Sequence, residues 1–173
     1  MGNGTLLHAT PMTHDLGTLV SLLGREHWRV EAVTVRLHVL RMAIGGDWPG
    51  SLDDADAGLA DAVDRLRHEE LARAVVANGC GVRYGLDSEP TLAALAAHAP
   101  DDVAVELARV ADGLAAAIEV ARTTAADVIT HLDDAPYERP MAPLTPTRAA
   151  AIARLLQRVV PASLDAFLGL RVG

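Results

Sequence analysis

The sequence predicts an all-α protein, an antiparallel bundle of three to four long helices with a proline-linked amphipathic helix at its C-terminal end. Half of the 173 residues are apolar, yet only 3% are aromatic, so alanine, leucine and valine supply most of the apolar surface. Alanine and leucine favour helices, whereas strands concentrate aromatic and β-branched residues. At this length one domain is expected, and its core belongs to residues 13–132.

We expect the first long helix over residues 13–43, after a flexible N-terminal segment of residues 1–12. Thr13 is the candidate N-cap. Apolar residues recur at steps of three, four and seven, which places them on one helical face, and Glu26 is the one polar residue on this face. The apolar members are Leu16, Leu19, Leu23, Val30, Val33, Leu37, Leu40 and Ile44. A helix of this length requires an equally long partner helix.

The second helix is expected to begin after a breaker rich in glycine. Ser51 followed by Asp54 resembles a capping box, and Gly85 is a suitable C-terminal stop. Its apolar face begins with Leu52, Leu59, Val63 and Leu66. Leu71 and Val75 then indicate that the apolar stripe moves to another face in the second half of the helix. The run 78–81 contains two glycines and predicts fraying or a kink in the second helix.

Three more segments follow before the tail. Ser88 is expected to cap a short third helix with Pro90 in its first turn. A long fourth helix is expected over residues 101–132. Residues 133–146 contain four prolines, which exclude a regular helix and predict a linker.

Residues 147–173 form the expected amphipathic tail, which carries several arginines although the chain as a whole has a net charge of −8. An apolar stripe on a short helix is typical of a segment that binds another helix. The candidate partner-binding residues are Ile152, Arg154, Leu155, Leu156, Arg158, Val159, Leu164, Phe167 and Leu168. Two alternatives stay open: the tail packs back on its own bundle, or it is exchanged between copies of the chain in a homo-oligomer.

Composition restricts the class of partner. A negative net charge argues against nucleic acid as the main partner, which demands a positive surface. The chain contains no long apolar run and no signal-like start, so we expect no membrane insertion and a cytoplasmic location. The single cysteine, Cys80, excludes an internal disulfide framework.

No catalytic or cofactor motif is found, so the chain is expected to be no enzyme and to hold no cofactor or metal. The histidines show neither the Glu-x-x-His nor the His-x-x-x-His spacing of helical metal sites. The alternative is a metal-binding bundle or enzyme that combines histidines with carboxylates of a facing helix. The candidate histidines are His27, His38, His68 and His131.

Several motifs resemble those of the FlgN-type flagellar export chaperones over about residues 16–132. They are the run Leu22–Glu26, the Arg-, Ala- and Val-rich stretch Arg67–Val76, the glycine turn Tyr84–Leu86, and the pattern Thr91-Leu92-x-x-Leu95-Ala96 followed by Pro100. The Asn-rich stretch of that family is replaced here by Arg122–Ala125, and the tail shows no family pattern.

The resemblance implies a non-enzymatic cytoplasmic chaperone of type III secretion. Such a chaperone binds the amphipathic helix of a secreted subunit, a hook-associated protein in flagellar assembly, and prevents its premature assembly. It also implies that the client binds towards the C-terminal part of the chaperone, which corresponds here to the candidate partner-binding residues of the tail.

Overall fold

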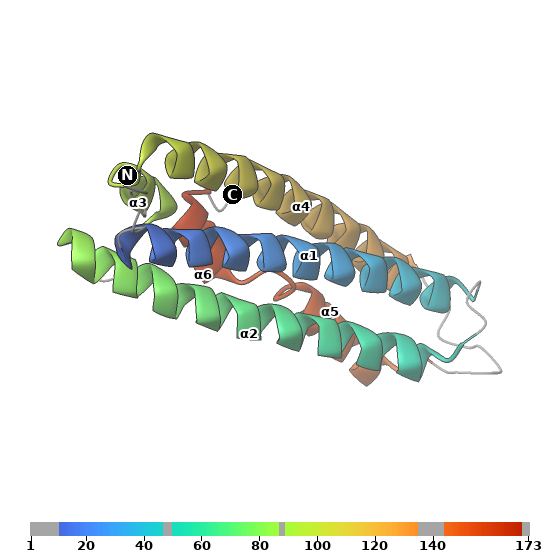
Figure 1. The fold of residues 1–173 in the computed structure, drawn as a ribbon. Coiled ribbons are helices and arrows are strands. Elements are labelled where there is room, and N and C mark those ends of the chain that lie inside the picture. Colours follow the sequence, from blue (N-terminus) through green and yellow to red (C-terminus); the bar gives the residue numbers. More distant parts are fainter. Residues whose placement is uncertain (1–10, 47–49, 87–88, 135–143, 171–173) are drawn as a thin grey trace, which may run out of the picture.

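The structure is a computed structural model that describes residues 11–46, 50–86, 89–134 and 144–170. Over these ranges the chain is helical and contains no strand, which confirms the all-α class. The helices are α1 (Pro11–Gly45), α2 (Leu52–Tyr84), α3 (Leu92–Ala96), α4 (Asp101–Asp134), α5 (Pro146–Leu156) and α6 (Ala162–Leu168). Figure 1 shows three long helices lying lengthwise beside one another.

Helix α1 is the centre of the bundle. It packs along both α2 and α4, whereas α2 and α4 make at most marginal contact with each other. Helices α1 and α4 run in the same direction and α2 runs antiparallel to both (Figure 1). Because α2 and α4 are held apart, the bundle has room for a further element beside α1.

The C-terminal tail occupies the position between α2 and α4 as a broken fourth helix. Its α5 packs against α4, and its α6 reaches α3 at the far end of the bundle. Arg148 of α5 forms an ion pair with Asp53 at the start of α2, with 2.6 Å between nitrogen and oxygen. The tail therefore begins beside the start of α2 and runs parallel to it (Figure 1).

The apolar face predicted for the first helix is confirmed, since all eight of its apolar residues are buried. Their periodicity places them towards α2 and α4. One continuous core cluster joins them to α2, α3, α4 and the tail. Over the described ranges no helix combines the length and the apolar character that a membrane span requires.

The caps of α2 are as predicted. Ser51 is the N-cap, and its hydroxyl oxygen accepts a hydrogen bond from Asp54 N at 3.0 Å. At the other end Gly85 adopts a left-handed conformation with φ of 69°, and its N–H bonds to carbonyls of the last turn. Each cap satisfies backbone groups that a helix end leaves without partners.

Two predictions around α3 are wrong. Helix α2 continues through the run 78–81 without a break to Tyr84. A Cβ atom at Gly81 would lie 2.8 Å from Pro90 Cγ, so the glycine permits the close approach of the chain before α3. Helix α3 is capped by Thr91, whose Oγ1 accepts from Ala94 N at 3.2 Å, rather than by Ser88, which lies outside the described residues.

Other boundaries differ slightly from the predictions. Helix α1 begins at Pro11, so Thr13 lies in its first turn and is not its cap, and residues 1–10 of the expected flexible segment lie outside the described ranges. Most of the expected linker, residues 135–143, also lies outside them. Pro146 is the first residue of α5, where the missing N–H of proline costs no hydrogen bond.

Candidate functional site

The candidate partner-binding residues of the tail occupy three environments. Arg154 and Arg158 are exposed. Leu155 and Leu168 are half-buried and pack against the core. The remaining residues are buried, namely Ile152, Leu156, Val159, Leu164 and Phe167. The apolar side of the tail thus packs on the bundle of its own chain, and its contact with a partner stays a prediction.

A charged pair lies inside the bundle beside α6. Glu26 of α1 is 0% exposed and Arg73 of α2 is 3% exposed. Arg73 Nε donates a hydrogen bond to Glu26 Oε1 at 3.0 Å. The guanidinium carbon of Arg73 lies 4.2 Å from the centre of the Phe167 ring, a cation–π distance. Arg73 therefore connects α1, α2 and α6.

The ion pair with Arg73 leaves one carboxylate oxygen of Glu26 without a hydrogen-bond partner. This oxygen, Oε2, is buried. Burial raises the pKa of Glu26 to about 7, because the loss of water disfavours the charged form more than Arg73 favours it. The pair consequently changes its charge state near neutral pH.

Further polar contacts connect α6 to both α2 and α4. The buried carboxylate of Asp165 forms an ion pair with Arg122 of α4. The hydroxyl of Ser163 donates a hydrogen bond to Glu70 of α2. Asp165 Oδ1 is buried without a hydrogen-bond partner. A seven-residue helix is thus positioned by charged groups from α2 and α4 as well as by its apolar side chains.

A cleft of about 580 Å³ opens between α2 and the tail. One wall is the outer face of α2 and the other is the segment that joins α5 to α6. The lining combines apolar side chains with two arginines and one glutamate, and consists of Arg67, Glu70, Leu71, Ala74, Gln157, Arg158, Val160, Pro161 and Ala162. Its size is within the range of sites that bind side chains or small molecules.

A second cleft of about 300 Å³ lies beside the first along α2. The two clefts share Glu70 and Ala74. The second one reaches Asn78 on α2, Glu89 before α3, and Phe167 on α6. We refer to the two clefts together as the α2–tail groove.

The apolar stripe of α2 does not move to Leu71 and Val75, so this prediction is wrong. Each of these side chains is 66% exposed. After Leu66 the buried face continues without a change of phase, at steps of seven, four and three residues, through Arg73, Ala77 and Cys80. Leu71 lines the α2–tail groove, whereas Val75, one turn further along α2, lies outside the lining of both clefts.

Sequence reasoning missed Arg73 because arginine is usually an exposed residue. A signal was nevertheless present in Glu26, the one polar residue on the apolar face of α1. A buried carboxylate requires a partner of opposite charge. The facing helix α2 offers Arg73 at a position that continues its buried face.

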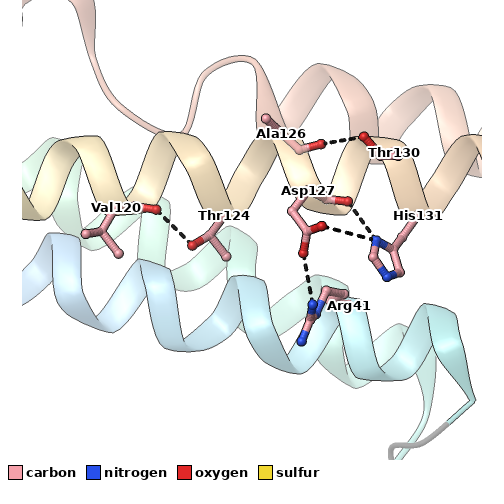
Figure 2. A network of polar contacts seen from close by, with 7 residues as sticks. All are labelled: Arg41, Val120, Thr124, Ala126, Asp127, Thr130 and His131. Atoms are coloured by element: carbon pink, nitrogen blue, oxygen red, sulfur yellow. Dashed lines mark hydrogen bonds and ion pairs between the residues drawn. The ribbon is translucent and has the colours of Figure 1, made fainter.

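Figure 2 shows a polar network at the opposite end of the bundle from α3. Arg41 Nη1 of α1 donates to Asp127 Oδ2 of α4 at 3.0 Å. His131 Nδ1 lies 2.9 Å from the backbone oxygen of Asp127 and 3.5 Å from its Oδ1. The network joins α1 to α4 and accounts for the position of His131.

The other candidate histidines also have local contacts. His68 Nδ1 lies 2.7 Å from the backbone oxygen of Asp64, and His27 Nε2 lies 3.5 Å from Glu31 Oε1, in each case within one helix. His38 is exposed on α1. Within the described part of the chain no three His, Cys, Asp or Glu residues come together as metal ligands.

Comparisons with family models, curated proteins and solved structures find no match to this chain. The resemblance to FlgN-type chaperones therefore stays an expectation from sequence motifs.

Proposed function

We propose that the chain is a non-enzymatic chaperone or adaptor that binds an amphipathic helix of another protein. By the resemblance to FlgN-type proteins, the partner is a secreted subunit, of the hook-associated class in flagellar assembly, and binding takes place in the cytoplasm. The chaperone covers the helix and prevents its premature assembly. The client-binding region is the tail together with the part of α2 that forms the other wall of the α2–tail groove.

One observation carries the proposal. The fourth position of the bundle is filled by two short helices, and they leave the α2–tail groove open beside them. A groove between helical walls with a largely apolar lining is the usual receptor for an amphipathic helix. The exposed side chain of Leu71 lies in this groove, where a partner would remove it from water.

The charges of the tail support the same interpretation. Arg154 and Arg158 lie one turn apart and are exposed, while the buried residues of the tail face the bundle. Charged residues at the rim of an apolar surface give a partner its orientation and increase the rate of association. The tail thus offers a basic rim next to the apolar groove.

The test is co-expression with the secreted, helix-ended subunits encoded beside the gene of this chain. The proposal predicts a stable complex with one of them in size-exclusion chromatography with light scattering. It also predicts that the complex is lost when the terminal helix of the subunit is deleted. Separate elution of the chain and every such subunit would contradict the proposal.

A further inference from the structure

We propose that the α2–tail groove binds one amphipathic helix whose acidic end faces Arg67 and Arg158. This inference rests on the proposed function and names the docking site of the client helix and the chemistry of that helix.

The length of the groove suits a short helix. The lining on α2 extends from Arg67 to Asn78, which corresponds to about 16 Å along the helix axis. About three helical turns have the same length. The two clefts lie end to end along α2 and share Glu70 and Ala74 in their linings, and the hydrogen bond from Ser163 to Glu70 joins α6 to α2 at this point. The proposed helix lies along α2 over both clefts.

The apolar surface of the groove fits one stripe of that helix. Leu71 lines the first cleft from α2, and 66% of its surface is in water. Ala74 is the small residue that both clefts share, and Pro161 belongs to the opposite wall. Apolar residues at positions i, i+4 and i+7 of a partner helix would cover these side chains.

The charges distinguish the two ends of the groove. Arg158 is exposed and forms no ion pair within the described ranges, and Arg67 pairs only with Asp64 on its own helix, at 3.2 Å. The other end carries the exposed carboxylate of Glu89. Glu70 lines the same cleft and accepts a hydrogen bond from Ser163, so two arginines face one carboxylate at this end. In a chain of net charge −8, this local excess of positive charge favours a partner with carboxylates at that end.

The probe for this inference is a fluorescently labelled synthetic peptide of about four helical turns. It carries leucine at i, i+4 and i+7 and glutamate at one end. Binding to the full-length chain is measured by fluorescence anisotropy. A second peptide has lysine in place of glutamate, and a third has the same composition without the apolar stripe.

The variants change exposed side chains, so that the fold is retained, which thermal unfolding verifies. Leu71→Glu places a charge in the groove, and Arg158→Glu reverses the charge at its mouth. The matched control is Val105→Glu, because Val105 is 70% exposed and lies on α4, away from the groove.

We expect saturable binding of the acidic peptide to the wild-type chain and to the Val105→Glu variant. Leu71→Glu should weaken it by about tenfold or more, as expected for a central interface residue. Arg158→Glu should weaken the acidic peptide and strengthen the lysine peptide. The peptide without an apolar stripe should not bind.

Three results would overturn the inference. One is equal binding by wild type and both groove variants, and another is no saturable binding of the acidic peptide. The third is a dimer of the chain that Leu71→Glu dissociates without any peptide binding, which would assign the groove to a second copy. If a secreted subunit binds wild type and both groove variants equally, this inference fails while the proposed function stands.

Discussion

Arg73 of α2 donates a hydrogen bond to Glu26 of α1 across 3.0 Å, and both side chains are buried in the bundle. Taking two charges out of water is unfavourable, and their attraction offsets this only in part. The pair therefore contributes less to net stability than to the alignment of α1 with α2. The guanidinium of Arg73 also contacts the Phe167 ring of α6.

The first prediction concerns removal of one member of this pair. Arg73→Met keeps the volume of the side chain but leaves the Glu26 carboxylate without its partner, which costs about 3 kcal/mol at a pH above 7. The double variant Glu26→Leu with Arg73→Met should recover most of this loss. Urea unfolding of the wild type, of Arg73→Met, of Glu26→Leu and of the double variant measures the cycle. A double variant as unstable as the sum of the single ones would contradict the account.

The second prediction is a pH dependence that originates from Glu26. Its pKa is raised to about 7 in the folded chain from an ordinary value of 4.5, so the folded state binds more protons than the unfolded state between these values. The stability contributed by Glu26 should therefore be highest at low pH and fall as pH rises through this window, by roughly 3 kcal/mol at most.

Comparison with Glu26→Gln isolates this effect from all other titrating groups. The free energy of unfolding of wild type minus that of the variant should decrease from about pH 5 to about pH 8 and then stay constant. A difference that is independent of pH would show that Glu26 titrates near its ordinary value.

The helical bundle and the caps of α2 follow from local patterns that the sequence displays. The heptad-like face of α1 and the pair of Ser51 and Gly85 each depend on a few neighbouring residues. The exposure of Leu71 depends instead on Arg73 and Glu26, which meet from different helices. Periodicity alone assigned Leu71 to the core, because it counts apolar residues and overlooks a buried ion pair.

The α2–tail groove could not be predicted from the sequence, for a related reason. Its walls are α2 and the tail, and the contact between Glu70 and Ser163 joins residues 93 positions apart. No local sequence pattern predicts a contact between residues so far apart in the chain. The amphipathic character of the tail was predictable, whereas its position between α2 and α4 follows from the spacing that α1 imposes on them.

The third prediction concerns two glycines of α2, Gly79 and Gly81. Gly81→Ala would place a Cβ atom 2.8 Å from Pro90 Cγ and should destabilise the chain by about 1 to 3 kcal/mol. Gly79→Ala meets no atom within 4 Å and should stabilise it by roughly 0.5 to 1 kcal/mol. Thermal or urea unfolding of both variants distinguishes them, and equal effects would refute the close contact at Gly81.

The fourth prediction concerns the attachment of α6. Phe167→Ala removes a buried ring and its contact with Arg73, which should cost about 3 kcal/mol or more. Amide hydrogen exchange in α6 should accelerate more than in α1. Arg154→Ala is the control in the tail, since Arg154 is exposed and its change should stay within about 0.5 kcal/mol. Uniform acceleration over all helices would contradict a separately attached α6.

The central claim is that another protein's helix binds in the α2–tail groove, and amide hydrogen exchange of the full chain with and without its secreted client tests it most directly. The account predicts new protection on α2 between Arg67 and Asn78 and in the tail between Gln157 and Phe167, with α4 around Val105 unchanged. Protection confined to other surfaces, or none in the presence of excess client, would contradict it.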